Sequence, residues 1–423
     1  MLSQILPSYS IAICTKESGG YYFMTPAHPG TIGQHAITYN MILEGNGDLF
    51  YFKWLIGLNK SADFQLLPNG MMSYFSDSKY YLMDKSFSIV DSVYCKNGLK
   101  TDNHELILLP NGHFLLMGSE EIEMDLTEFK FFKQVKSDSS CVPVIFGAIQ
   151  ELDAQKNVVF EWHCKDHFKL ADVDTFFFND PKTLDLTHFN AIEQDTDSNF
   201  IISIRNFSEV AKISRKDGHI IWRMGGRNNQ FTFINDPLMF KGQHNFRKLP
   251  GNRFTLFDNG RGYEPFHPAT AKEYILDEKA MTLNLVWSYV NDSTSESARG
   301  LGNVQRLANG NTLVNYGASN RAKTLFSVVK LDGTKCFEMY FRDFRRSYRI
   351  LNYEAVQFKV KRPVIKTFKK HGQLFLDAGK GHASYLWSNG ATTRIIAVNK
   401  GVFFVCVPVG SNALLVSSPY RVD

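Results

Sequence analysis

The sequence predicts an all-β fold, a six-bladed β-propeller followed by a small β-sandwich. Three observations predict it: a hairpin phrase built on an Asn-Gly turn, a second phrase built on an Asp turn, and weak helical periodicity throughout the 423 residues. Hydrophobic residues make up 44% of the chain and aromatic residues 14%. This composition is enough to fill a core between packed sheets.

The first phrase is an apolar strand, a turn that contains Asn-Gly, and a second apolar strand. Asn and Gly both tolerate positive φ, which a tight hairpin needs. The phrase occurs at 66–70 and 108–112, with variants at 249–252 and 307–311 and looser copies at 44–48 and 195–199. We interpret each copy as the turn of a β-hairpin.

The second phrase is an apolar residue, an Asp with a small turn, and a strand that ends in an aromatic residue. Its aspartates stand at positions 153, 217, 277 and 332, so the successive separations are 64, 60 and 55 residues. Two hairpins in each repeat give four antiparallel strands, as in a propeller blade. About 350 residues at about 60 in each repeat give six blades. A β-sandwich array is the alternative, but it would not need both phrases in every repeat.

A different pattern follows the repeats. The repeat register ends near Tyr353, and Lys361-Arg362-Pro363 is typical of a linker. Residues 383–405 resemble the small immunoglobulin-like β-sandwich modules found at the C-termini of many exported bacterial proteins. We therefore divide the chain into a propeller over 1–360 and an accessory sandwich over 361–423. The second part has no polar cluster typical of a catalytic site, so we expect it to serve stability or surface attachment.

Charge and cysteine usage exclude several classes of function. The net charge is +5, and the basic residues are scattered, which argues against nucleic acid as a partner and mildly favours anionic substrates. The six cysteines lie far apart without a C-x-x-C, so neither a zinc site nor a disulfide framework is expected. No apolar run reaches 18 residues, which predicts no transmembrane helix. The first 14 residues do not form a typical signal peptide.

Three histidines occupy equivalent places in three repeats. His104 and His244 each precede the proline of the hairpin turn by six residues, and His188 precedes the longer turn of its own repeat. The innermost strands of a propeller line its central channel, and residues at their starts face the channel mouth. One such histidine alone is typical of a hydrogen-bonded strand residue. Three that converge on one channel, among only 12 histidines in the chain, indicate a functional site.

Arg205 lies in the second strand of the repeat that carries His188. A guanidinium suits an oxyanion, although a structural salt bridge is the alternative for this residue. Three imidazoles could also bind zinc or copper, but an arginine beside a metal is unusual and no carboxylate belongs to the set. We therefore expect an anion site that needs no metal and no cofactor. The sequence contains neither a P-loop nor a lipase-type G-x-S-x-G motif, and no glycosidase-type pair of acids stands out.

From about residue 21 to 353 the chain resembles the arylsulfotransferase family that works without a nucleotide sulfate donor, in its divergent bacterial branch. The stretches that carry the resemblance are 186–192, 203–213, 220–226, 242–245, 256–260, 302–307 and 310–314. The resemblance implies a six-bladed propeller in which a channel histidine becomes transiently sulfated. By the motif Gly242-Gln243-His244-Asn245 that role falls on His244, and the roles that assist the sulfuryl group fall on His104, His188 and Arg205.

The implied reaction moves a sulfuryl group from a phenolic sulfate ester to a phenol, so phenolic sulfates and phenols are the expected small-molecule partners. The resemblance also implies an exported protein, in the periplasm, at the cell surface or secreted. Two other functions stay open. One is a propeller without turnover that binds sulfated or carboxylated ligands, and the other is a sulfate-ester hydrolase with water as the acceptor.

Overall fold

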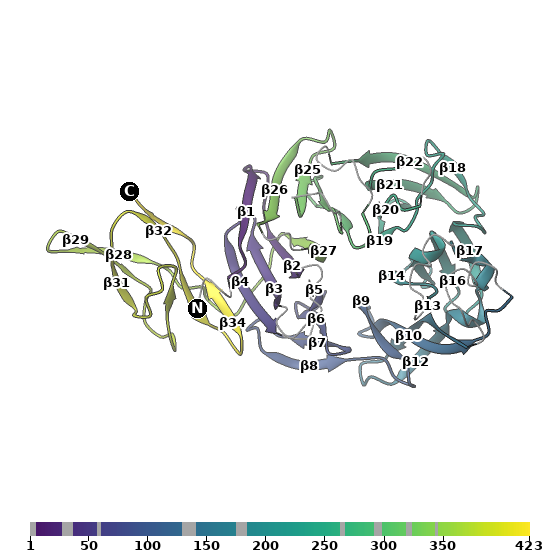
Figure 1. Cartoon of the computed structure of the whole chain (residues 1–423), viewed down its shortest axis with the longest axis horizontal. Coiled ribbons are helices and arrows are strands. Elements are labelled where there is room, and N and C mark those ends of the chain that lie inside the picture. The colour runs from purple at the N-terminus through teal and green to yellow at the C-terminus, as the bar shows by residue number, and fades with distance from the viewer. Residues whose placement is uncertain are drawn as a thin grey trace.

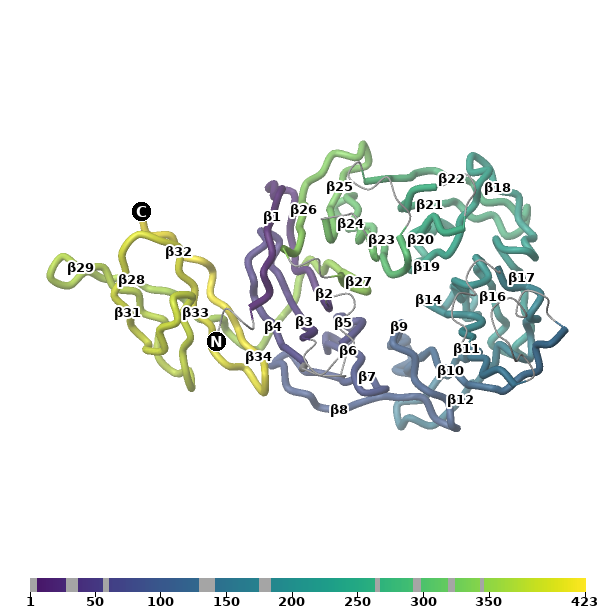
Figure 2. The backbone as a smooth tube through the Cα atoms, viewed as in Figure 1, coloured from purple at the N-terminus to yellow at the C-terminus, as the bar shows by residue number. Residues whose placement is uncertain are grey.

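The computed structural model describes residues 6–27, 37–56, 61–128, 141–174, 184–262, 267–291, 298–318, 324–342 and 346–423. Over these residues the chain is all-β, with antiparallel sheets of four or five strands and a few short 3-10 helices between them. No helix in this part of the chain is long and apolar enough to cross a membrane. Figures 1 and 2 show the sheets arranged in a ring, with a lobe of C-terminal strands on one side.

Four of the sheets are built from consecutive strands. The first is β5 (Ala62–Leu66), β6 (Met72–Ser76), β7 (Lys79–Met83) and β8 (Ile89–Val93). The second is β9 (Lys100–Leu108), β10 (Phe114–Met124), β11 (Val142–Leu152) and β12 (Val158–His163). The third is β14 (Phe189–Gln194), β15 (Phe200–Ile204), β16 (Glu209–Ile213) and β17 (Ile220–Gly225). The fourth is β19 (His244–Leu249), β20 (Arg253–Asp258), β21 (Thr270–Asp277) and β22 (Thr282–Tyr289).

The two predicted phrases are hairpin turns, as expected. The Asn-Gly phrase joins β5 to β6 and β9 to β10, where Gly70 and Gly112 have φ values of 79° and 84°. The Asp phrase joins the third strand to the fourth, as in β11–β12 and β21–β22. Two short strands extend these sheets in parallel: β13 (Leu184–Asp185) pairs with β11, and β18 (Thr232–Ile234) pairs with β22.

Two further sheets combine strands from distant parts of the chain. In one, β1 (Tyr9–Cys14) pairs with the outermost strand of β23 (Asn303–Arg306), β24 (Thr312–Asn315), β25 (Phe326–Val329) and β26 (Lys335–Phe341). In the other, β27 (Arg346–Tyr353) pairs with β2 (Tyr21–Ala27), which is followed by β3 (Ile37–Glu44) and β4 (Leu49–Ile56). The N-terminal strands and β27 therefore close the ring.

The first strand of each of these six sheets faces the centre of the ring. The inner strands are β5, β9, β14, β19, β23 and β27, each contacts the next, and β27 contacts β5. The hydrophobic core lies between neighbouring sheets. In one such cluster Trp162 of β12 packs with Phe189 and Phe200 of the next sheet, and its Nε1 donates to Gly218 O at 2.8 Å. The arrangement brings residues near the starts of different inner strands together.

The C-terminal strands continue one of the ring sheets. β30 (Leu386–Trp387), β33 (Val405–Pro408) and β34 (Ala413–Val416) extend β4 into a seven-stranded sheet through the pairing of β34 with β4. The others are β28 (Lys366–Lys370), β29 (Gln373–Asp377) and β31 (Ile395–Val398), which form one sheet, and β32 (Gly401–Phe403) and β35 (Tyr420–Val422), which pair. Arg362, in the predicted linker, bonds to Glu44 and donates to Val416 O at 2.8 Å, so this segment is docked on the sheet.

Candidate active site

The structure brings the three predicted histidines together across the neighbouring inner strands β9, β14 and β19. The ring centroids of His104 and His188 are 5.1 Å apart, and those of His188 and His244 are 6.3 Å apart. His244 opens β19 and His188 directly precedes β14, whereas His104 lies in the middle of β9. Arg205 follows β15 as the first residue of the 3-10 helix η5 (Arg205–Phe207). We refer to His104, His188, Arg205 and His244 as the mouth cluster.

The hydrogen bonds of His244 define its tautomer. Its Nδ1 lies 2.8 Å from Asn259 Oδ1 and 3.2 Å from Gly242 O, and because both atoms are acceptors, Nδ1 carries the proton. Asn259 Nδ2 donates to Leu301 O at 3.0 Å, which fixes the orientation of the amide. Nε2 therefore carries the lone pair of the ring, and it accepts a hydrogen bond from the Leu301 N–H at 3.2 Å.

The surroundings of His244 keep its imidazole neutral. The side chain is buried, with only 1% of the residue exposed. Burial, followed by the positive charge of Arg205 and the neighbouring His188, lowers the pKa of His244 well below its ordinary value. A neutral imidazole with a defined lone pair is the form that acts as a nucleophile.

His104 and His188 are each paired with an aspartate. Asp102 lies 2.6 Å from Nδ1 of His104, and Asp185 lies 2.6 Å from Nδ1 of His188. Each aspartate also accepts the backbone N–H of its histidine, at 2.8 and 3.0 Å. The prediction that no carboxylate belongs to the set was therefore wrong, because two aspartates two and three residues upstream fold back onto the rings.

These carboxylates shift the protonation of the site. Burial acts against a charged His104, but the charge and hydrogen bond of Asp102 raise the pKa of His104 above its ordinary value. Burial likewise acts against a charged Asp185, but His188 holds the pKa of Asp185 below its ordinary value. The site thus places a neutral His244 in the same cluster as His104, whose imidazole favours the protonated form.

The turn that presents His188 is held from both sides. His188 has a φ of +48°, in the left-handed region that is uncommon for a residue with a side chain. Its carbonyl accepts the Arg205 N–H at 3.2 Å, and the Gly147 N–H donates to Thr187 Oγ1 at 2.9 Å. A Cβ at Gly147 would lie 2.5 Å from the Phe189 ring, so only glycine allows this close approach. Strained backbone that is held in this way is a common feature of functional sites.

Arg205 adds positive charge to the mouth. Its Nη1 donates to Asn206 Oδ1 and its Nη2 to Arg299 O, both at 2.8 Å. Burial, together with the charge of Arg261, lowers the pKa of Arg205 to about 10, so the guanidinium stays charged at neutral pH. Burial and the charge of Arg299 also lower the pKa of Arg261 and of Arg346. Such a gathering of guanidinium groups favours an anionic ligand.

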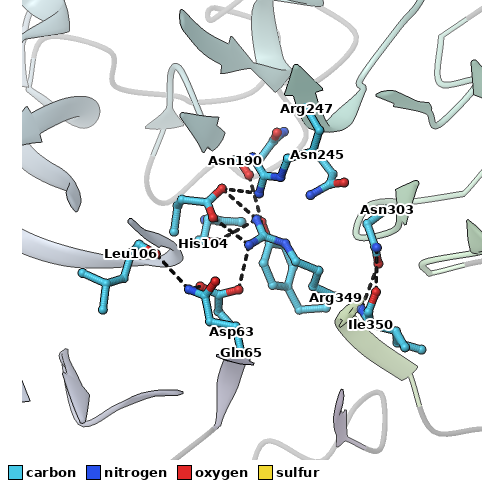
Figure 3. A network of polar contacts seen from close by, with 12 residues as sticks. Asp63, Gln65, His104, Leu106, Asn190, Asn245, Arg247, Asn303, Arg349 and Ile350 are labelled. Carbon is cyan, nitrogen blue, oxygen red and sulfur yellow. Dashed lines mark hydrogen bonds and ion pairs between the residues drawn. The ribbon is translucent and has the colours of Figure 1, made fainter. Parts of the chain in front are cut away.

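Next to the mouth cluster lies a set of buried charges that the sequence interpretation missed (Figure 3). Arg349 donates through Nη1 to Asp63 at 2.8 Å and Glu105 at 2.7 Å, and through Nη2 to Glu105 at 2.9 Å and to His104 O at 3.2 Å. Arg247 bonds to Glu105 and, at 3.2 Å, to Glu193. We refer to Asp63, Glu105, Glu193, Arg247 and Arg349 as the inner-strand ion network. Its members come from five different inner strands, so no short sequence motif contains enough of them to predict the network.

Tyr348 links the two sets. Its ring centroid lies 5.0 Å from that of His104, and its hydroxyl donates to Asn190 O at 2.9 Å. Among the residues that the structure describes, no group of three or more His, Cys, Asp or Glu side chains is arranged to hold a metal ion. Four of the six cysteines are buried, namely Cys95, Cys164, Cys336 and Cys406.

Comparison with known protein families shows which family the chain belongs to. The profile of the family described as Arylsulfotransferase (ASST) matches residues 31–349, which is more than half of the chain. The chain belongs to the arylsulfotransferase family. Membership in this family implies activity of the aryl-sulfotransferase type on aryl sulfates. The matched span contains all four residues of the mouth cluster.

Solved structures similar to this chain are distant in sequence. A protein of unknown function from Bacteroides caccae is 10% identical, over 79% of this chain and 98% of its own, with a TM-score of 0.49. A streptogramin B lyase is 10% identical over 87% of this chain and 94% of its own, with a TM-score of 0.40. A catalytically inactive virginiamycin B lyase from Staphylococcus aureus is 11% identical over the same shares, with a TM-score of 0.39. Likenesses this distant say nothing about the reaction. No curated protein matches the sequence.

Proposed function

We propose that this arylsulfotransferase-family chain is a six-bladed β-propeller with an accessory immunoglobulin-like sandwich. It transfers a sulfuryl group from a phenolic sulfate ester to a phenol through a sulfated His244. The observation that carries the proposal is the state of His244. Its Nδ1–H is bound by Asn259 and Gly242, so the neutral Nε2 presents its lone pair beside positively charged groups.

In the first half-reaction, Nε2 of His244 attacks the sulfur of the donor, the S–N bond forms, and the bond from sulfur to the phenolic oxygen breaks. Asn259 Oδ1 and Gly242 O accept from Nδ1–H and stabilise the positive charge that develops on the ring. The charge of the transferring group spreads over its three oxygens, as in phosphoryl transfer. The Leu301 N–H, 3.2 Å from Nε2, is placed to donate to one of them once Nε2 has bound sulfur.

Arg205, His104 and His188 supply the remaining donors. Their positive charge and N–H groups stabilise the oxygens of the sulfuryl group and the leaving phenolic oxygen. A donor of this kind is worth about 3 kcal/mol of transition-state stabilisation. In the second half-reaction the acceptor phenol takes the sulfuryl group from His244 and regenerates the neutral imidazole. The scheme predicts ping-pong kinetics.

The test is to incubate the protein with a chromogenic aryl sulfate alone, digest it and weigh the peptides. The peptide that contains His244 should gain about 80 Da, the mass of SO₃, and a phenol added afterwards should remove it. His244→Ala and His244→Asn should lose both the label and transfer. His219→Ala is the matched control, because His219 is an exposed histidine paired with Asp217 in the turn between β16 and β17, the outer two strands of their sheet.

The outcomes separate the three candidate functions. Labelling of His104 or His188 instead of His244, or transfer by His244→Ala at a comparable rate, would contradict the assignment. Release of phenol without an acceptor would indicate a sulfate-ester hydrolase. Binding of the aryl sulfate without label or turnover would indicate a binding protein.

A further inference from the structure

The strongest unassigned feature near the mouth cluster is the pair formed by His188 and Asp185 together with the pocket beside it. We propose that Asp185 is a positioning residue that makes His188 the proton carrier for the phenolic oxygen, and that this pocket takes the ring of the phenol. The inference rests on the proposed function and extends it to the proton that the reaction must move.

The pocket has a volume of about 220 Å³. Its walls include Asp102, His104, Ser119, Gly147, Asp185 and His188. Ligand sites for drug-sized molecules start at about 300 Å³, so this pocket suits one aromatic ring rather than a fused ring system. Both histidine–aspartate pairs lie on its wall, so the hydroxyl of a phenol bound in the pocket would lie close to groups that can accept or donate a proton.

His188 is the better placed of the two imidazoles. Its ring lies between those of His104 and His244, 5.1 and 6.3 Å away between centroids. The His188 side chain is 30% exposed, whereas that of His104 is 10% exposed, so a substrate reaches His188 more easily. Because Asp185 occupies Nδ1 at 2.6 Å, Nε2 is the nitrogen of His188 that exchanges a proton with the substrate.

Asp185 has the charge that this role requires. Its carboxylate stays ionised next to two imidazoles, since His188 and His104 both favour its charged form against the effect of burial. An ionised carboxylate at Nδ1 fixes the tautomer of a histidine and stabilises its imidazolium, as in the hydrolase triad. The left-handed turn at His188 is held by Asp185 as well, through the bond from the His188 N–H at 3.0 Å.

Over the two half-reactions, His188 gives up one proton and takes up one proton, so it returns to its starting state. As the bond from sulfur to oxygen breaks and Nε2 of His244 binds sulfur, the imidazolium of His188 gives its Nε2 proton to the leaving phenolic oxygen. In the second half-reaction, neutral Nε2 of His188 takes the proton of the acceptor hydroxyl. The acceptor oxygen binds sulfur and the bond from sulfur to His244 breaks.

The test compares two donors in single-turnover experiments with Asp185→Asn. 4-Nitrophenolate is a good leaving group and departs without a proton, whereas phenolate, whose acid has a pKa of about 10, needs one. We expect Asp185→Asn to slow sulfation of His244 from phenyl sulfate about 100-fold or more, and from 4-nitrophenyl sulfate only a few-fold. A structural defect would slow both donors alike, so equal slowing would overturn the proposal. Asp185→Glu, which retains the carboxylate, should recover part of the phenyl sulfate rate.

Two matched variants sharpen the result. Asp102→Asn removes the same kind of partner from His104, and it should slow both donors by similar factors. If Asp102→Asn alone discriminates between the donors, His104 is the proton carrier and the proposal fails. Ser119→Phe fills the pocket and leaves the four residues of the two pairs unchanged, and it should raise KM for phenyl sulfate with little change in kcat. An unchanged KM would overturn the placement of the ring.

The controls distinguish this inference from the proposed function. A wild-type chain that labels His244 while Asp185→Asn treats both donors alike retains the proposed function and loses only the inference. A wild-type chain that transfers sulfate without labelling His244 overturns both.

Discussion

The inner strands carry two layers of polar residues that differ in how their charges are used. In the inner-strand ion network, Arg349 meets Asp63 and Glu105 at 2.7 to 2.9 Å and is 3% exposed. In the mouth cluster, a side-chain oxygen holds Nδ1 of each imidazole, and Nε2 of His244 accepts a longer bond, at 3.2 Å, from the backbone N–H of Leu301. Charges that neutralise one another are typical of structural roles. Groups with one committed nitrogen and one available nitrogen are typical of catalysis.

The largest expected effect comes from breaking the inner-strand ion network. Arg349→Met leaves the buried carboxylates of Asp63 and Glu105 with one cation fewer, so the free energy of unfolding should fall by about 3–5 kcal/mol. Denaturant-induced unfolding measures it. Arg205→Met is the matched control in the mouth cluster, where the arginine bonds to an amide and a carbonyl, and its loss should be clearly smaller. Equal losses in the two variants would contradict the distinction between the layers.

Substitutions within the mouth cluster should lower the rate of transfer and leave the stability of the fold nearly unchanged. Arg205→Lys keeps the charge but loses the planar fork that matches the oxygens of a sulfuryl group. We expect turnover to fall about 100-fold, by analogy with the loss of an oxyanion donor, while the unfolding midpoint changes little. Steady-state assays and thermal unfolding on the same preparation check both halves. Near-normal turnover would assign Arg205 a structural role.

Two carboxyl groups, Glu193 of the inner-strand ion network and Asp185 beside the mouth cluster, should contribute pH dependences of opposite sign to the stability. Burial, reinforced by Glu105 and opposed by Arg247, raises the pKa of Glu193 to about 7. The folded state then holds this proton more tightly than the unfolded state, so stability falls as the pH rises from about 4.5 to about 7, and Glu193→Gln should remove that part of the slope. The pKa of Asp185 is lowered, so its stabilisation is present above the ordinary range of Asp and is lost on acidification. Asp185→Asn should remove a slope of the opposite sign.

Unfolding midpoints of the wild type and both variants, measured from about pH 7 to below the ordinary pKa of Asp, about 3.9, provide the comparison. Superimposable pH profiles for the wild type and Glu193→Gln would contradict a buried, protonated Glu193. If both variants change the slope of stability against pH with the same sign, burial does not raise the pKa of Glu193 while pairing lowers that of Asp185, and the comparison fails.

The smallest expected effect is that of metal removal. Because the mouth cluster combines imidazoles with Arg205, we expect the rate of transfer to be the same before and after exhaustive dialysis against a chelator. Elemental analysis accompanies the assay. The interpretation as an anion site would be wrong if the protein contains stoichiometric zinc or copper, and if activity is lost when that metal is removed and restored when it is returned.

Much of the fold could be predicted from the sequence because its signals are local. Each hairpin turn is encoded by a few adjacent residues, and the register of His104 and His244 relative to their turn prolines placed both on inner strands. The strand that closes the ring, β27, ends at Tyr353, the residue near which the repeat pattern of the sequence also ends. The family resemblance is confirmed, whereas the roles of the four site residues and the division at residue 360 stay predictions.

The inner-strand ion network could not be predicted, because its partners are remote in sequence. Asp63 and Arg349 are 286 residues apart, and Glu105 and Arg349 are 244 apart. Only the closure of the ring brings them within bonding distance. The aspartates of the mouth cluster were different, since Asp102 and Asp185 precede their histidines by two and three residues. Because an aspartate closely precedes the histidine in two repeats, the sequence could have predicted the histidine–aspartate pairs, but our interpretation did not use this pattern.

The position of β27 also bears on how the protein is made. Translation proceeds from the N-terminus towards the C-terminus, so a nascent chain contains His104, His188, Arg205 and His244 well before β27 (Arg346–Tyr353) leaves the ribosome. Until then the ring is open. His104 lacks both the ring of Tyr348 and the bond from Arg349 to its carbonyl. A ribosome-bound chain thus contains every residue of the mouth cluster before the strand that completes their surroundings has been made.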